Sequence, residues 1–431
     1  MASSLEAAFE KACEQGIMAG AVLLAAVKDK GIVYSKSFGQ RSLAKDSEPL
    51  LIDDMMQLFS CSKLVTTIAA LQLVERGLFG LDQDVSTILP ELAALKVLSG
   101  MNDGQPVFEE QKTPITLRQL LSHSSGVTYA LLSPLIVKYN KSQGLPSQMP
   151  FRTVTESFST PLVYQPGTSW KYSPGVDWAG LLISRLTGIS LEEYTQKYIA
   201  SPLKIGDMTY FVNDNPSLKS RMAATVIRDP SVPDGMGNVV PNDRPEILNE
   251  MREELGGAGL CTSMPSYIKV LYSLLANDEK LLKKETVTMM FEPQLRPASQ
   301  KALQAYFDHI PKGASGPAPP FIGEFPQAKY DWGLGGMLSM DDIDAGSLAW
   351  RRKRFFSWGG LANLFWFIDR QAGLCGVFGT QVIPNGDEQV RKMISLFEKE
   401  IVYVLRANRN KTVPYGNGTA ILKTIATLED P

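Results

Sequence analysis

The chain is poor in the residues that metal sites and histidine-dependent catalysis require. Its 431 residues include only two histidines and four cysteines, and no Cys-x-x-Cys pair. Without clustered ligands, the sequence predicts no metal site and no bound cofactor. A Ser-His-Asp triad would have to draw on the two histidines, and the G-x-S-x-G elbow of many serine hydrolases is absent. The cysteines are expected to be reduced thiols of the core. They are Cys13, Cys61, Cys261 and Cys375.

The chain also lacks an excess of one charge and a long apolar run. Its 43 basic residues nearly balance 45 acidic residues, which gives a formal net charge of -2. This balance argues against a nucleic acid partner, because such a partner favours a basic surface. No apolar run reaches the roughly 18 residues of a membrane span, and the first segment, MASSLEAAFEKACEQG, mixes charged residues with apolar ones. A cytoplasmic protein without a membrane partner is expected.

Strand patterns occur at both ends of the chain. Residues 21–28 and 32–38 have the composition of two strands joined by a turn. Near the other end, RFFSWGG, NLFWFID and LCGVFGTQV are short aromatic and branched runs, and a helical pattern follows them. The middle is mostly helical. The sequence therefore predicts an α/β (α+β) fold, in which one antiparallel sheet is formed from both chain ends, is flanked by helices and carries an inserted, mainly helical domain.

These patterns give expected domain boundaries. The sheet domain comprises residues 1–85 and 255–406, and the helical domain comprises residues 86–254. Residues 407–431 have a weak pattern and are expected to form a C-terminal extension. Residues 312–327, rich in Pro and Gly, predict a long loop. A functional site is expected at the seam between the two domains.

One lysine stands where helix electrostatics disfavours a cation. In LFSCSKLVTTIAALQLVERG, a nearly all-apolar helix begins beside Lys63. Burial and the positive end of the helix dipole both disfavour its ammonium, which favours a neutral amine near neutral pH. Ser60 lies three residues earlier, so the two side chains are expected to share a face. A neutral amine there can accept the Ser60 proton, which makes Ser60 a candidate nucleophile and Lys63 a candidate general base.

The alternative is a structural role, in which Ser60 only caps the helix and Lys63 extends to solvent. The spacing alone does not decide, because Ser266 and Lys269 repeat it. There, a preceding serine and proline are typical of an ordinary helix start. Only Ser60 opens a helix too apolar to give its lysine an exposed face, so Ser60 is preferred. His123, at the end of LRQLLSHSSG, is expected to be a structural residue where a helix stops.

Several motifs resemble those of one enzyme family, and they occur in the same order. SCSK resembles the S-x-x-K motif of the serine β-lactamase and penicillin-binding superfamily. ITLRQLLSHSSGV, YQPGTSWKYSPGVDWAGLLISRLTG, LGGAGLCTSMPSYIKVL and WGLGG are similar to blocks of its class C and esterase branch. TTIAALQLVERGL, SYIKVLYSLL and WRRKRFFSWGGLAN are similar to fungal transesterases of that branch. The resemblance extends from about residue 5 to residue 405. It implies a β-lactamase/transpeptidase-like fold and a serine-dependent acyltransferase or esterase.

The resemblance also implies roles for residues beyond the S-x-x-K pair. Tyr172 of KYSPG matches the family tyrosine that shares proton transfer with the lysine, and a neighbouring cation stabilises its phenolate. SWGGLAN stands in place of the K-T-G strand, so Trp358, Gly359 and Gly360 would contact the substrate. The backbone N–H groups of the nucleophile and of Leu361 would form the oxyanion hole.

Two departures from the family pattern concern the substrate. Trp358 replaces the K-T-G lysine, which in β-lactamases helps to hold a substrate carboxylate. Pro174 replaces the Y-x-N asparagine, which helps to hold an amide side chain. Both changes favour esters or thioesters with an apolar acyl group over anionic β-lactams. Tyr129 aligns with a tyrosine near the transesterase pocket. Tyr129 and Trp358 would either line the acyl site or be ordinary core residues.

A basic run precedes the Trp358 strand. It is expected to lie on a solvated hairpin, or alternatively to dock an acyl carrier protein or a coenzyme A phosphate. The run is Arg351, Arg352, Lys353 and Arg354.

Together these residues predict a serine acyltransferase, a transesterase of fungal-type secondary metabolism. An acyl-enzyme would form from a thioester or ester donor and pass its acyl group to a hydroxyl of a small, polyketide-like acceptor. One alternative is a carboxylesterase with water as the acceptor, because the same residues serve both reactions. Another alternative is a non-catalytic binding protein that retains the fold. The presence of Ser60, Lys63 and Tyr172 together argues against it.

Overall fold

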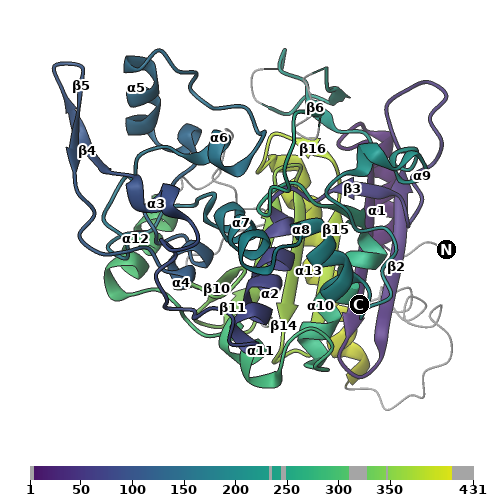
Figure 1. Cartoon of the computed structure of the whole chain (residues 1–431). Helices are drawn as coiled ribbons and strands as arrows, with labels where there is room; N and C mark the ends of the chain where they lie inside the picture. The colour runs from purple at the N-terminus through teal and green to yellow at the C-terminus, as the bar shows by residue number, and fades with distance from the viewer. Residues whose placement is uncertain (1–3, 233–234, 244–248, 310–327, 346–347, 410–431) are drawn as a thin grey trace.

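One seven-stranded sheet contains strands from both ends of the chain (Figure 1). The computed structural model describes residues 4–232, 235–243, 249–309, 328–345 and 348–409. Neighbouring strands of the sheet pair antiparallel. This arrangement confirms the predicted sheet and the α/β class. The strand order is β2 (Gly31–Gly39), β1 (Gly20–Val27), β15 (Leu374–Gly379), β14 (Leu364–Asp369), β13 (Phe356–Gly360), β10 (Met337–Ser339) and β9 (Tyr330–Trp332).

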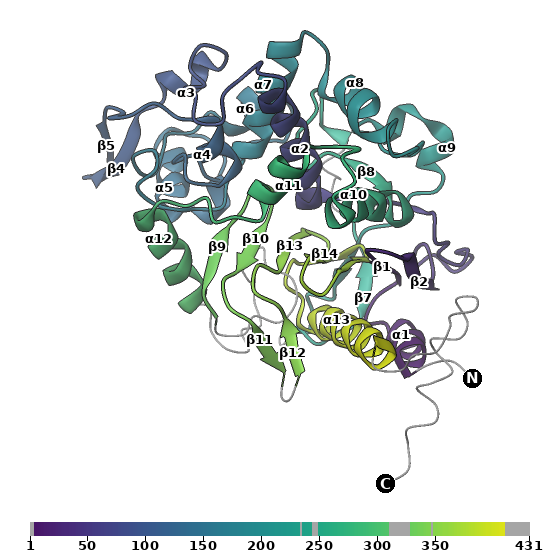
Figure 2. The ribbon, with the colours of Figure 1, turned by 90° about the horizontal axis from the view of Figure 1, so that it is seen from below.

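Helices cover both faces of this sheet (Figure 2). The helices of the described ranges are α1 (Ser4–Glu14), α2 (Ser62–Glu75), α3 (Pro90–Ala94), α4 (Leu117–Leu121), α5 (Pro134–Ser142), α6 (Val154–Phe158), α7 (Gly175–Thr187), α8 (Leu191–Thr195), α9 (Pro216–Lys219), α10 (Met264–Ala276), α11 (Lys284–Met290), α12 (Pro297–Asp308) and α13 (Glu388–Arg409). α1 and α13 lie side by side on one face, whereas α10 packs against β1, β14 and β15 on the other. α2 packs against α7 on the α10 side of the sheet.

Strand β1 shows why the sheet is buried on both faces. Successive side chains of a strand point to opposite faces. Val22 and Leu24 belong to the large core that also contains residues of α2 and α10, whereas Ala21 and Leu23 belong to a second core with residues of α1 and α13. Because neither face of β1 meets water, its sequence is a continuous apolar run instead of an alternating one.

Between residues 86 and 254 the described helices are mostly short and outnumber the strands, which include strands that the sequence did not indicate. The largest is a hairpin of β4 (Val97–Asn102) and β5 (Gln105–Glu109), joined through Asp103 and Gly104 with φ values of 47° and 79°. These left-handed conformations are typical of a two-residue hairpin turn. Most of β5 is exposed, so its residues lack the apolar alternation that marks a half-buried strand.

Short strands complete the described structure. β3 (Met55–Gln57) pairs with β8 (Cys261–Ser263). β6 (Val226–Arg228) lies between β7 (Val239–Pro241) and β16 (Val382–Ile383). β11 (Ile343–Ala345) pairs with β12 (Leu348–Arg351).

The expected domain boundaries, residues 1–85 with 255–406 and residues 86–254, stay a prediction. Residues 410–431 of the predicted extension and the predicted loop at 312–327 lie outside the described residues. Within the described ranges, no helix is both long and apolar enough to cross a membrane.

Candidate active site

Ser60 lies in a short 3-10 turn, η1 (Phe59–Cys61), that leads directly into α2. Phe59 has a φ of 48°, in the left-handed region that a bulky side chain rarely adopts. The chain therefore turns sharply just before the serine. The hydroxyl of Tyr267, from α10, donates to the carbonyl of Cys61 over 2.9 Å and so connects this turn to α10. The position of Ser60 is thus set by the backbone turn at Phe59 before it and by the Tyr267 contact at Cys61 after it.

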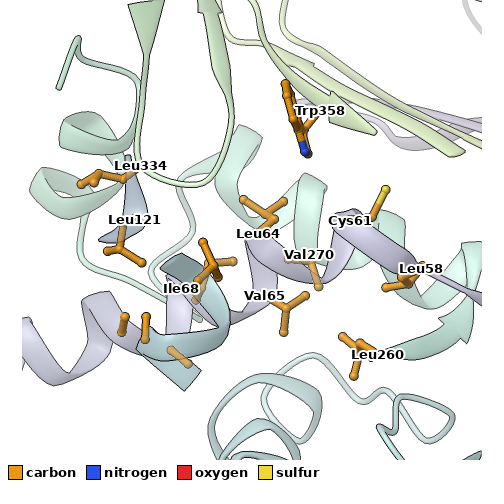
Figure 3. Close-up of a cluster of buried hydrophobic side chains, with 14 of the residues drawn as sticks. Leu58, Cys61, Leu64, Val65, Ile68, Leu121, Leu260, Val270, Leu334 and Trp358 are labelled. Carbon is orange, nitrogen blue, oxygen red and sulfur yellow. The ribbon is translucent and has the colours of Figure 1, made fainter. Parts of the chain in front are cut away.

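Helix α2 is buried on every face over residues 62–73. This confirms the prediction that the apolar run has no exposed face. Lys63 is only 1% exposed, so the alternative in which its amine reaches solvent is wrong. Figure 3 shows the side chains of this helix enclosed by residues from other elements, among them Leu121, Val270, Leu334 and Trp358.

The amine of Lys63 meets three oxygen atoms inside this core. Its Nζ atom lies 3.3 Å from the Oγ of Ser60, 3.0 Å from the hydroxyl oxygen of Tyr129 and 2.8 Å from the carbonyl oxygen of Gly257. A buried amine without partners would be costly, and these contacts offset that cost. The predicted approach of Ser60 to Lys63 is therefore present in the structure. Tyr129, proposed only as a pocket residue, in fact contacts the lysine directly.

Asp177, on α7, is a further charged residue at this site. It is fully buried. Its carboxylate accepts the O–H of Tyr129 over 3.3 Å and the backbone N–H of Gly257 over 2.8 Å. Burial raises the pKa of Asp177, and the nearby charge of Lys63 acts in the opposite direction. The pKa of Tyr129 lies well above its usual range, first because the phenol is buried and second because Asp177 is close.

Sequence reasoning did not identify Asp177 or Gly257. One signal was present, since Asp177 is the only acidic residue in the apolar stretch GVDWAGLLI. A charged residue that interrupts a buried helix must have a partner. The partner could not be named, because Tyr129 is 48 residues away and Gly257 is 80 residues away along the chain.

Tyr172 lies beside Lys63 but is held by a different residue. The Nζ of Lys63 is 4.9 Å from the centre of the Tyr172 ring. The indole N–H of Trp358, from β13, donates to the hydroxyl oxygen of Tyr172 over 3.1 Å. The structure thus brings Tyr172 and Trp358 together next to the lysine. The proton-transfer role expected for Tyr172 stays a prediction.

His123 packs behind Tyr172 and takes no part in the Lys63 contacts. Its ring centre is 4.7 Å from that of Tyr172, and its Nδ1 lies 3.0 Å from the Oγ of Ser173. Burial, and to a lesser degree the charge of Lys63, holds the pKa of His123 well below its usual range. His123 has a φ of 59° and lies two residues beyond the end of α4. The helix thus stops slightly earlier than expected, and a neutral His123 supports the segment that carries Tyr172.

Strand β13 brings its glycines against the serine turn. A Cβ atom on Gly360 would lie only 2.4 Å from the backbone carbonyl oxygen of Leu58, so a larger residue would push the strand away. Leu361 follows directly and is 39% exposed. The strand end with Gly359, Gly360 and Leu361 therefore lies beside the turn that carries Ser60. The oxyanion and substrate-binding roles of this segment stay predictions.

The other candidate nucleophiles differ from Ser60 in their surroundings. Ser266 is buried on α10, and the Nζ of Lys269 donates to the carbonyl of Lys204 over 3.0 Å. Cys61 follows Ser60, but burial raises the pKa of its thiol, so it stays protonated. All four cysteines are thiols outside any disulfide, and Cys61, Cys261 and Cys375 are buried as expected. The expected core position is wrong for Cys13, which is only partly buried. In the part of the chain that the structure describes, no group of His, Cys, Asp and Glu side chains could hold a metal ion.

The basic run before β13 is only partly exposed. Arg351 is 1% exposed and forms a buried ion pair with Glu398 over 2.7 Å. The expectation that the run is solvated is therefore wrong for Arg351. A docking role for Arg351 is also wrong, because its guanidinium is paired with Glu398 of α13 inside the core. Arg352 and Arg354 are each paired with a carboxylate as well. A docking role for Arg352, Lys353 and Arg354 stays a prediction.

Comparison with known proteins gives consistent matches over nearly the whole chain. The Beta-lactamase family matches residues 5–416. The chain is 39% identical to a lovastatin esterase of Penicillium rubens, with 92% of this chain and 97% of that protein covered. It is 36% identical to a monacolin J acid methylbutanoyltransferase of Aspergillus terreus, with 92% and 94% covered.

A solved structure agrees with these matches. A mutant of the simvastatin synthase of Aspergillus terreus has a TM-score of 0.83 and 38% identity, with 94% of this chain and 95% of that chain covered. The fold and the family resemblance predicted from the motifs are thereby confirmed. The relatives include both an acyltransferase and an esterase.

Proposed function

The chain belongs to the Beta-lactamase family, among its serine acyltransferases and esterases, and we propose that it transfers an acyl group through Ser60 to a hydroxyl of a small molecule. The observation that carries this proposal is the buried contact of 3.3 Å between the Nζ of Lys63 and the Oγ of Ser60. At this distance the amine is within hydrogen-bond reach of the hydroxyl whose proton it would accept. The proposal assigns the nucleophile to Ser60 and the general base to Lys63.

The proposed reaction has two halves. In the first, Lys63 takes the proton of Ser60, the oxygen attacks the carbonyl carbon of an ester or thioester, and Tyr172 protonates the leaving group. In the second, an acceptor hydroxyl loses its proton through Tyr172 and Lys63, and its oxygen attacks the acyl carbon. The bond from that carbon to the Oγ of Ser60 then breaks, and Lys63 returns the proton to the serine oxygen. The backbone N–H groups of Ser60 and Leu361 would stabilise the oxyanion in both halves.

The residues near Tyr172 favour an apolar acyl group. Trp358 is 3% exposed and stands where β-lactamases have a lysine, so no cation at that place would attract a substrate carboxylate. Tyr129, Gly359 and Gly360 would complete the acyl site. A thioester on an acyl carrier protein or on coenzyme A is the proposed donor, and a polyketide-like alcohol is the proposed acceptor. The names of the relatives, which mention methylbutanoyl transfer and lovastatin, support this class of substrate.

Hydrolysis is the second candidate, because a relative of similar identity is an esterase. Both reactions share the acyl-enzyme and differ in whether water or an alcohol reaches it. The test is to supply one short-chain acyl thioester with increasing concentrations of polyketide-like alcohols, and to measure ester product against free acid. Transfer requires that at least one alcohol yields more ester than acid. Acid in excess at every alcohol concentration would instead assign a carboxylesterase.

A further inference from the structure

One buried carboxylate holds two of the three hydrogen-bond partners of Lys63. The Oδ2 of Asp177 accepts the O–H of Tyr129, and the Oδ1 accepts the N–H of Gly257. Tyr129 and Gly257 in turn present oxygen atoms to the Nζ of Lys63, at 3.0 Å and 2.8 Å. Asp177 therefore reaches the lysine through two intermediate groups, one a side chain and one a backbone peptide.

The backbone is shaped to let this carboxylate approach. A Cβ atom on Gly257 would lie 2.3 Å from the Oδ2 of Asp177, so a larger residue there would displace the carboxylate. Asp177 is completely buried, and burial of a carboxylate is costly unless hydrogen bonds compensate for it. A buried carboxylate next to a candidate base favours a functional role for Asp177 over a purely structural one.

The count of donors and acceptors at Lys63 depends on its protonation state. An ammonium has three N–H donors and no lone pair, so it can donate to all three oxygen atoms. A neutral amine has two N–H donors and one lone pair. The carbonyl oxygen of Gly257 can only accept. The oxygen of Tyr129 also accepts while its own proton lies on the Asp177 side. The two N–H groups are then engaged, and the lone pair is left for the hydroxyl of Ser60.

We propose that Asp177 is a positioning residue, which keeps Tyr129 an acceptor toward Lys63 and thereby directs the lone pair of the neutral lysine at Ser60. This inference rests on the proposed function, in which Lys63 is the base. Without the carboxylate, the O–H of Tyr129 is free to turn and donate to the lone pair, in competition with Ser60. The raised pKa of Tyr129 is consistent with this arrangement, because a phenol that keeps its proton stays a donor to Asp177.

The substitution Asp177→Asn tests the proposal with almost no change of shape. The amide oxygen can still accept the N–H of Gly257, but the amide NH2 group then faces Tyr129 and donates to it. The O–H of Tyr129 is thereby turned toward Lys63. We expect the rate of Ser60 acylation by a short acyl thioester, followed by intact mass, to fall roughly 100-fold, with the KM for the donor changed little.

A second substitution separates positioning from a structural role. Tyr129→Phe removes the competing hydroxyl and is expected to cost only a few-fold in acylation rate by itself. In the double variant, Asp177→Asn with Tyr129→Phe, acylation should be about tenfold faster than with Asp177→Asn alone, because nothing competes for the lone pair. Circular dichroism and the thermal midpoint establish that each variant is folded.

Three results would overturn the inference. Asp177→Asn within about threefold of the wild-type acylation rate would remove the need for the carboxylate. A double variant as slow as Asp177→Asn, or slower, would assign Asp177 a merely structural role. If Asp177→Asn does not fold, Tyr129→Phe alone still tests the inference. A loss of acylation rate as large as that of Lys63→Met would mean that Tyr129 carries the proton, which contradicts a role as acceptor only. A wild type that is not acylated would instead contradict the proposed function.

Discussion

The amine of Lys63 is buried on the first turn of an apolar helix. The prediction that follows concerns Lys63→Met, which keeps an unbranched side chain in the core and removes the base. Acylation of the protein by a thioester should fall roughly 100-fold or more. Single-turnover intact mass measures this rate. Lys269→Met, at the second S-x-x-K, is the matched control and should acylate like the wild type. A loss of less than about tenfold for Lys63→Met would exclude the base role.

His123 gives a prediction about stability. Its pKa lies well below the usual value of 6.5, because burial disfavours the imidazolium. The unfolded chain therefore binds a proton that the folded chain does not bind as pH falls below 6.5. The stability contributed by neutral His123 is present above that pH and is lost below it, at up to about 1.4 kcal/mol per pH unit.

The test for His123 compares how steeply the free energy of unfolding changes with pH in two proteins, and not their absolute stabilities. His123→Asn keeps a residue that tolerates the φ of 59° and removes the titrating ring. We expect the free energy of unfolding in urea to fall less steeply for this variant than for the wild type between about pH 7 and pH 5. Equal slopes would mean that His123 is protonated in the fold.

Some residues of the site could be predicted from the sequence, and others could not. Ser60 and Lys63 were found because residues three apart share a face, and that rule needs no tertiary structure. Tyr172 and Trp358 came from motif resemblance. Asp177 could not be found in either way, because its partners come from distant segments and its role depends on which atom donates. The burial of Arg351 was missed for the same reason.

At the scale of elements, the site depends on how closely β13 approaches η1. Gly360→Ala would place a Cβ atom 2.4 Å from the carbonyl oxygen of Leu58 and should push the strand end away from the serine turn. If the N–H of Leu361 belongs to the oxyanion hole, kcat should fall roughly 100-fold, as expected for the loss of one donor. Gly206→Ala, where a Cβ would meet nothing within 4 Å, is the control and should leave kcat unchanged.

Two outcomes of the Gly360→Ala experiment would count against this account. A kcat within about threefold of the wild type would show that the strand end does not contribute to the transition state. If kcat falls equally in the Gly206→Ala control, the effect comes from replacing glycine with alanine in general and not from the position of Gly360. Steady-state kinetics with an ester substrate and the thermal midpoints of both variants provide these comparisons.

Elements with a strong apolar pattern were predicted well, and those without one were not. β1 is an uninterrupted apolar run, and its expected range differs from the observed range by one residue at each end. The hairpin of β4 and β5 was missed, because an exposed strand needs no apolar alternation. The start of α2 was clear from composition. The 3-10 turn before it was not, because its geometry depends on Phe59 and on the contact of Tyr267 with the neighbouring carbonyl.

At the scale of the whole molecule, the fold brings together residues that are far apart in sequence. β13 lies near the C-terminal end of the chain and η1 near the N-terminal end, yet the two are in contact because the central sheet joins both ends. The sequence predicted this sheet from strand patterns at the two ends. It could not predict which helical residues would face Lys63, since that depends on how α7 packs against α2.

The central claim is that Ser60 carries the acyl group. The most direct measurement is the intact mass of the protein after exposure to a short acyl thioester, with peptide digestion to locate the adduct. The account predicts one acyl group per chain on the peptide that contains Ser60, no adduct on Ser60→Ala, and wild-type labelling of Ser266→Ala. A wild type without an adduct, or an equal adduct on Ser60→Ala, would contradict it.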